Sequence, residues 1–219
     1  MQTRSLLNEE LDKVRRELTL MATMVEEDIG KALAMVRSGD EELAREVKES
    51  GKAVDALQLK IENMALVLIA TQQPVASDLR EMVMVFKIAA SLERINDYSI
   101  HLVKIAKKLS GRPAFRSLER VERMVETAQA MLKAAFSAYL AKNVDAARKA
   151  ALMDDLIDVE HKALVDEVLS FMKENRKLVK AASRLLRLSG YMERLGDHIT
   201  NICEAISYMV RGRHEKLNE

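Results

Sequence analysis

The segment 191–198 reads Tyr-Met-Glu-Arg-Leu-Gly-Asp-His, and the segment 91–98 reads Ser-Leu-Glu-Arg-Ile-Asn-Asp-Tyr. Each segment places a Glu and an Asp four positions apart, and the two Glu residues, at 93 and 193, are 100 positions apart. Side chains at i and i+4 lie above one another on one face of a helix, so each segment would display two stacked carboxylates. The match extends upstream, where Lys87-Ile88 corresponds to Arg187-Leu188. The chain is therefore predicted to be a tandem repeat of helical units.

The composition is typical of long helices. Hydrophobic residues make up 48% and charged residues 32% of the 219 residues, with only 7 Gly and 2 Pro to interrupt helices. The 35 Lys and Arg nearly balance the 34 Asp and Glu, so the chain has no overall basic field that would attract nucleic acid. We expect no nucleic-acid partner.

The sequence predicts a soluble, cytoplasmic protein. Cys203 is the only cysteine, which excludes an intrachain disulfide and does not suggest an oxidising compartment. Acidic residues interrupt the first apolar residues before a signal peptide could form. The most apolar run, 64–70, is far shorter than the roughly 20 residues that cross a bilayer.

Apolar periodicity predicts an all-α fold of six long helices. Apolar residues recur every three or four positions from about 6 to 36, and a Ser-Gly-Asp at 38–40 ends that helix and caps the next. The predicted helices cover about 6–36, 41–70, 77–110, 115–140, 143–172 and 176–210. Short connections then favour two tandem antiparallel three-helix bundles, 1–112 and 113–219, joined at Arg112-Pro113.

Antiparallel packing predicts which acidic residues of the second half face each other. With the turn placed at 175–176, Glu193 is level with Asp158, and Asp197 is level with Asp154. Two helices would thus bring two i,i+4 carboxylate pairs side by side. The candidate metal ligands of this half are Asp154, Asp158, Glu193 and Asp197, with Asp155 on the flank.

The first half predicts a smaller acidic group. A turn near Val75 places Asp55 between the positions level with Glu93 and Asp97, whereas Gly51 stands where the second half has Asp154. His101 lies one helical turn beyond Asp97 and is expected to supply a further ligand. The candidate ligands of this half are Asp55, Glu93, Asp97 and His101.

Both carboxylate pairs are predicted to lie away from the apolar stripes of their helices. Clustered carboxylates repel one another unless they are protonated or neutralised, so the arrangement calls for cations. Oxygen ligands suit Mg²⁺, Mn²⁺ or iron. The alternative is a solvated face on which Arg94 and Arg194 pair with the acids, since exposed salt bridges contribute only about 0–1 kcal/mol.

The same residues resemble the PhoU family, the accessory and regulatory proteins of the phosphate-specific transport system. The resemblance is carried by Glu-Arg-Leu-Gly-Asp-His at 193–198, Asn-Ile-Cys-Glu at 201–204 and Tyr-Met-Val-Arg-Gly at 208–212 in the second half. In the first half it is carried by Met-Val-Glu-Glu at 24–27, Ser-Asp-Leu-Arg at 77–80 and Leu-Glu-Arg-Ile-Asn-Asp at 92–97.

The resemblance implies a negative regulator of the phosphate-starvation response that is not an enzyme. It would act as an adaptor between the phosphate ABC transporter ATPase and a sensor histidine kinase, reaching the membrane only through these protein partners, and a homodimer is expected. Carried over by residue, the family's metal positions fall on Glu93, Asp97, Glu193 and Asp197, with Asp55 and the Asp154, Asp155 and Asp158 group as partners. Asn96, His101 and Lys52 depart from the family pattern in the first half.

Two other functions compete with the adaptor. A ferritin-like di-iron enzyme would need Glu-x-x-His pairs on inward helix faces, and only Asp158-x-x-His161 comes near that pattern. A helical scaffold without metal is the second alternative. No Gly-rich phosphate loop or Ser-containing elbow favours a catalytic function.

Overall fold

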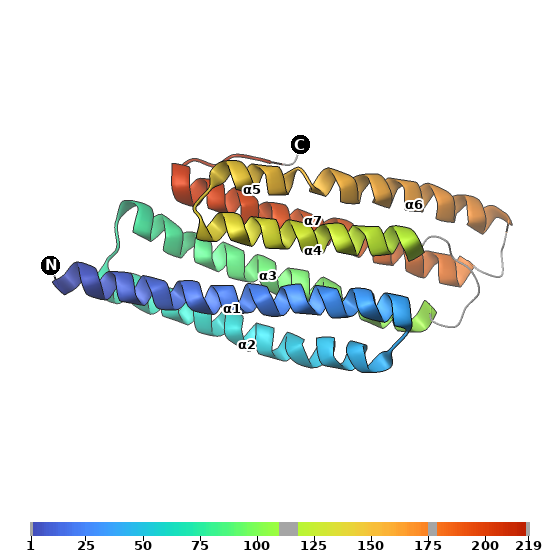
Figure 1. Cartoon of the computed structure of the whole chain (residues 1–219), viewed down its shortest axis with the longest axis horizontal. Coiled ribbons are helices and arrows are strands. Elements are labelled where there is room, and N and C mark those ends of the chain that lie inside the picture. The colour runs from blue at the N-terminus through green and yellow to red at the C-terminus, as the bar shows by residue number, and fades with distance from the viewer. Residues whose placement is uncertain (1, 110–117, 175–178, 218–219) are drawn as a thin grey trace.

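The computed structural model describes residues 2–109, 118–174 and 179–217, and within these ranges every regular element is an α-helix. The helices run along the long axis of an elongated molecule (Figure 1). Their bounds are α1 (Gln2–Ser38), α2 (Glu41–Gln72), α3 (Ala76–Leu109), α4 (Leu118–Leu140), α5 (Val144–Ala151), α6 (Asp154–Glu174) and α7 (Val179–Arg211).

Local sequence signals account for the turns of the first half. Gly39, with a φ of 72°, ends α1 by donating its N–H to the Met35 carbonyl at 2.8 Å, and Asp40 caps α2 by accepting from the Glu42 N–H at 2.9 Å. Gln73 ends α2 in the left-handed region, and its N–H donates to the Ile69 carbonyl at 3.2 Å. The turns therefore lie close to the positions that the Gly, Asp and Pro residues predict.

The second half differs from prediction in its middle helix. The helix expected over 143–172 is interrupted at 152–153 and continues as α5 and α6. Asn143 caps α5 by accepting the Ala146 N–H at 3.0 Å, as Asp40 caps α2. The acidic first turn of α6, Asp154 and Asp155, favours a new helix N-terminus, although no Gly or Pro marks the interruption.

Two sets of helices share one continuous hydrophobic core. α1, α2 and α3 pack on one another, while α4 and α7 both contact α5 and α6. The sets meet where α3 packs on α7 and where α1 packs on α4 (Figure 1). Buried apolar residues from both sets belong to a single cluster that extends from Leu7 to Met209. The predicted all-α fold of two related three-helix bundles is confirmed.

The predicted boundary at 112/113 lies in 110–117, outside the described residues. Among the described helices, none has a stretch that is both long and apolar enough to span a bilayer.

Candidate functional site

The acidic group of the second half, Asp158, Glu193 and Asp197, lies where α6 packs on α7 and is called the second acidic group. Burial and the neighbouring charge of Asp197 raise the pKa of Glu193, and Asp158 raises it further. Burial and the charge of Asp158 likewise raise the pKa of Asp197. Asp158 on α6 is therefore an electrostatic neighbour of both carboxylates on α7, so the structure brings these three predicted residues together.

Asp154 is turned into the protein and does not share the exposure expected of an acidic face. Only 4% of the residue is exposed, and the Thr200 hydroxyl donates to its Oδ2 at 3.3 Å. A Cβ atom placed on Gly196 would lie 2.0 Å from its Oδ1, so the glycine makes room for this carboxylate. The expectation of four outward carboxylates is therefore wrong for Asp154, because the start of α6 directs it against α7.

Asp155 and His161 are neighbours of this group on α6. Asp155 is exposed on α6, on the flank where the sequence placed it. Nδ1 of His161 lies 2.6 Å from the hydroxyl of Ser189, which is fully buried on α7. His161 is thus held against α7 by a side chain that solvent does not reach.

The first acidic group lies on α3, facing α2. Burial, the charge of Asp97 and the charge of Asp55 all raise the pKa of Glu93, whereas Arg94 opposes this rise. Arg94 lies 3.4 Å from Glu93 and 3.7 Å from Asp97. Asp55 is exposed on α2. The predicted partner on α2 is therefore near Glu93, and an arginine already pairs with both acids of α3.

His101 lies in the contact between α3 and α7 and stacks on another aromatic ring. The ring centroids of His101 and Tyr191 are 4.9 Å apart, and Tyr98 lies 5.8 Å from both Tyr191 and His198. These four residues come from the two repeated segments and their immediate continuation. The repeats therefore build the joint between the bundles as well as the acidic groups.

The side chains do not form a closed set of metal ligands. In the part of the chain that the structure describes, no group of three or more His, Cys, Asp or Glu residues is placed to hold a metal ion. Arg94 occupies the space beside the first pair, and Asp154 bonds inside the protein. The predicted metal sites stay predictions, with carboxylate donors of the kind that hard cations prefer but without a preformed ligand geometry.

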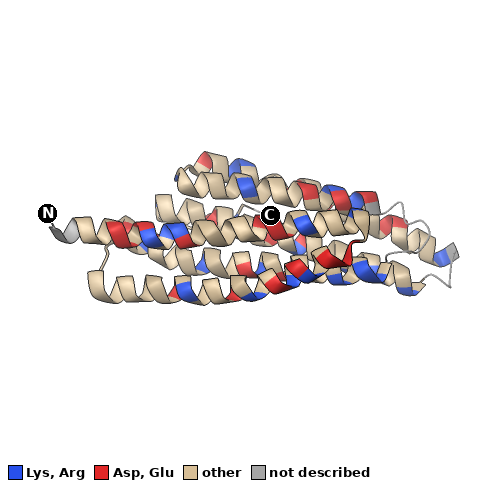
Figure 2. Cartoon of the chain, turned by 60° about the horizontal axis from the view of Figure 1, so that its bottom comes forward, with Lys and Arg blue, Asp and Glu red and all other residues tan. Residues whose placement is uncertain are grey.

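Charge is otherwise mixed over the surface. Figure 2 shows Lys and Arg interspersed with Asp and Glu along the helices. Cross-helix pairs include Lys60 with Glu17 at 2.7 Å and Lys31 with Glu46 at 2.9 Å. Local groups of charge, and not a single charged face, must therefore guide any electrostatic partner.

Sequence reasoning missed a buried ion-pair cluster between the bundles. Glu81 of α3 is 1% exposed and accepts two hydrogen bonds from Arg15 of α1, at 2.6 and 2.8 Å, and one from Lys142 after α4, at 2.8 Å. Burial alone would raise the pKa of Glu81, but the two cations outweigh it and leave the pKa lowered. The sequence does contain a signal for the burial of Glu81, because this residue lies on the apolar stripe that includes Val85 and Ile88.

The comparisons with known proteins agree with the repeat. The family model described as the PhoU domain matches residues 18–106 and again 121–206. A phosphate-specific transport system accessory protein PhoU homolog of Clostridium acetobutylicum is 32% identical over 99% of this chain and 100% of its own length. The accessory protein PhoU of Escherichia coli is 32% identical over 94% of this chain and 86% of its own length.

Solved structures give the same result. The phosphate transport system regulatory protein PhoU from Streptococcus pneumoniae superposes with a TM-score of 0.89 and 26% identity, covering 95% of this chain and 99% of that one. PhoU from Pseudomonas aeruginosa gives a TM-score of 0.89 and 29% identity, covering 94% and 99%. The resemblance inferred from the repeated Glu-Arg segments is thus confirmed, and the chain belongs to the PhoU family.

Proposed function

We propose that this chain is a negative regulator of the phosphate-starvation response, acting as an adaptor between a phosphate ABC transporter ATPase and a sensor histidine kinase. The observation that carries the proposal is the full-length match to accessory proteins of phosphate-specific transport, over both halves of the chain. Two related bundles joined along their length present two separate sets of outer helix faces (Figure 1). Such a shape suits a protein that contacts two partners.

The side chains that could act as nucleophile or base favour a regulator over an enzyme. Cys203 is fully buried, and burial raises the pKa of its thiol to about 12, so the reactive thiolate is disfavoured. The hydroxyl of Ser189 beside His161 is buried where a substrate could not reach it. Neither Cys203 nor Ser189 is thus available as a nucleophile, which supports the proposed regulatory function.

We also propose that the second acidic group attracts a divalent or trivalent cation such as iron, Mn²⁺ or Mg²⁺. Support comes from the raised pKa values of Glu193 and Asp197, which are caused first by burial and then by neighbouring carboxylates, Asp158 acting on both, because a bound cation would offset the repulsion from these carboxylates. Elemental analysis of the purified chain should then find metal in wild type and less in an Asp158→Asn/Glu193→Gln variant. An equal, negligible metal content in both would remove the cation from the account and leave the adaptor function standing.

The adaptor function is tested by direct association. The purified chain should be retained by immobilised transporter ATPase and, in a separate experiment, by the cytoplasmic part of the sensor kinase. Retention by neither partner would contradict the proposal. The expected homodimer remains a prediction for sedimentation analysis of the same sample.

A further inference from the structure

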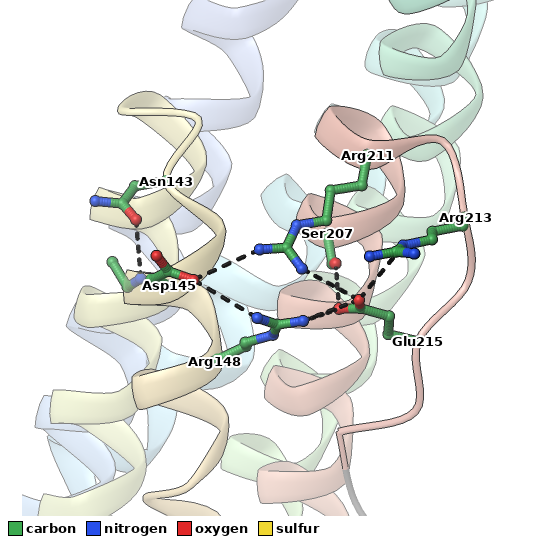
Figure 3. Close-up of polar contacts among 8 residues, drawn as sticks. Asn143, Asp145, Arg148, Ser207, Arg211, Arg213 and Glu215 are labelled. Atoms are coloured by element: carbon green, nitrogen blue, oxygen red, sulfur yellow. Dashed lines mark hydrogen bonds and ion pairs between the residues drawn. The ribbon is translucent and has the colours of Figure 1, made fainter.

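The segment that follows α7 folds back over α5 and α7. Gly212, with a φ of 71°, ends α7 by donating its N–H to the Tyr208 carbonyl at 2.8 Å. Glu215 then accepts hydrogen bonds from Arg148 of α5 at 2.8 and 2.9 Å and from Ser207 of α7 at 2.8 Å (Figure 3). A single glutamate of a non-helical segment thus bridges two helices of the second half.

Apolar and backbone contacts complete the seat of this segment. Leu217 packs against the hydrophobic core, and its N–H donates to Glu204 of α7 at 3.2 Å. The ring of His214 stacks on Tyr208 with centroids 4.1 Å apart. The groove between α5 and α7 is therefore filled by a segment that carries a glutamate and, two residues later, a leucine.

The repeat identifies the corresponding groove in the first half. Asp40 and Asn143 are equivalent N-caps, so Arg45 of α2 occupies the place of Arg148 of α5. On α3, positions 104 and 107 are equivalent to 204 and 207 of α7. The local pairing is repeated too, because Arg45 pairs with Glu42 as Arg148 pairs with Asp145.

The first-half groove is open within the described residues and carries more positive charge than its counterpart. Its volume is about 480 Å³. Lys104 and Lys107 replace Glu204 and Ser207, and Lys48 adds another cation. Among the described residues, Lys48 and Lys104 form no ion pair. Its basic residues are Arg45, Lys48, Lys104 and Lys107, against the acids Glu41 and Glu42.

Apolar side chains give this groove a second element of recognition. Ile100 and Val103 of α3 line it together with the aliphatic part of the basic residues. Val103 is buried, whereas Ile100 is half-buried and in contact with the core. An occupant that combines acidic groups with one apolar side chain would match both features.

We infer that the groove between α2 and α3 is a docking site for an acidic, non-helical segment of a partner protein, in which a leucine follows a glutamate by two positions. In the equivalent place of the second half, the chain's own segment pairs Glu215 with Arg148, the counterpart of Arg45, and packs Leu217 against the core. The connecting sequence 110–117 contains two arginines and no acid, so it offers no carboxylate for this groove. The inference rests on the proposed adaptor function, because that function supplies the partner protein to which the segment would belong.

The test measures binding of a fluorescein-labelled peptide, Asp-Glu-Asp-Leu-Asp-Glu, to the full chain by fluorescence anisotropy at low salt. The Lys48→Glu/Lys104→Glu variant should weaken binding at least about tenfold, because it places like charges opposite the peptide. Neither lysine is buried or ion-paired among the described residues, so circular dichroism should show an intact fold. The matched control is Lys162→Glu, an exposed lysine on α6, which should bind like wild type.

Three results would overturn the inference. The first is no saturable peptide binding, or equal affinity for wild type and the double variant. The second is equal affinity for a peptide in which serine replaces leucine, since the attraction would then be electrostatic only. The third is a wild-type dimer that the double variant abolishes in sedimentation velocity, which would make the tail of a second copy the occupant. Because the peptide assay needs no transporter or kinase, it can fail while the adaptor function stands, and the reverse also holds.

Discussion

Two buried acidic residues on helices of the first bundle, Asp28 and Glu81, have opposite pKa shifts. Asp28 of α1 is 1% exposed, and burial raises its pKa to about 6, although a hydrogen bond with Ser50 opposes the rise. Glu81 is equally buried but is held ionised by Arg15 and Lys142. Asp28 therefore weakens the fold at neutral pH, whereas Glu81 stabilises it.

Replacing Asp28 by asparagine should stabilise the protein at neutral pH. Because the folded pKa of Asp28 lies above its ordinary value of 3.8, the contribution of Asp28 to the free energy of unfolding should fall as the pH rises from 3.8 to about 6. That rise in pKa corresponds to at most about 3 kcal/mol. Urea unfolding should show the Asp28→Asn variant more stable at pH 7 and matching wild type near pH 4. Equal stability of the two proteins at pH 7 would mean that Asp28 ionises freely.

Both buried acids could have been found from the sequence. Asp28 falls on the stripe formed by Met21, Val25 and Ala32, and Glu81 precedes Val85 by one turn on another apolar stripe. An acid at such a position predicts burial. The sequence does not predict which partner neutralises it, because Arg15 and Lys142 are 66 and 61 positions away from Glu81.

At the scale of elements, the close contact of α6 with α7 depends on a glycine. A Cβ atom on Gly196 would lie 2.0 Å from Oδ1 of Asp154 and 3.1 Å from Cδ1 of Ile157, which is fully buried. Asp154 in turn accepts from Thr200 of α7. Asp154 and Ile157, near the start of α6, thus pack closely against Gly196 of α7. This contact lies just after the interruption between α5 and α6.

The Gly196→Ala variant should lose about 1–3 kcal/mol of stability, because the methyl group displaces a buried carboxylate and a core side chain. Thermal and urea unfolding followed by circular dichroism would measure the loss. The matched control is Gly190→Ala on the same helix, where a Cβ meets no atom within 4 Å. This control should gain about 0.5–1 kcal/mol from helix propensity. Equal effects of the two substitutions would contradict the fitted contact.

The elements themselves were mostly predictable. Glycine at 39, the Asp40 cap and Pro74 mark turns that the structure places within a few residues of prediction. The interruption at 152–153 was not predictable, since no Gly or Pro marks it and the contact that accompanies it is with a helix about 40 positions later. The proximity of Asp158 to Glu193 agrees with antiparallel packing of α6 on α7, whereas the inward orientation of Asp154 was not predicted.

At the scale of the whole molecule, Glu81 joins the two bundles. Its carboxylate connects α1 and α3 to Lys142 at the turn between α4 and α5, next to the buried hydroxyl of Tyr139. The aromatic contacts of α3 with α7 form a second joint further along. The bundles should therefore unfold as one unit.

Replacing Glu81 by glutamine should destabilise both bundles together. We expect a loss of about 1–3 kcal/mol at pH 7, because two cations lose a buried carboxylate while keeping access to water. The folded pKa of Glu81 is lowered, so its contribution is present at neutral pH and is lost as the pH falls below the ordinary value of 4.5. The difference in unfolding free energy between wild type and variant should accordingly shrink in acid. A difference that stays constant from pH 7 into acid would exclude the ion pairs as its source.

The most direct test of the account asks whether the second acidic group is part of the regulatory surface. A strain lacking this gene would carry a reporter driven by a phosphate-starvation promoter and be complemented with Asp158→Asn/Glu193→Gln/Asp197→Asn, or with the exposed control Asp166→Asn on α6. In phosphate-rich medium, we expect the control to keep the reporter repressed. The triple variant, present at normal abundance and folded, should leave it active. Full repression by the triple variant would contradict the assignment of Asp158, Glu193 and Asp197 to the surface through which the chain is proposed to regulate.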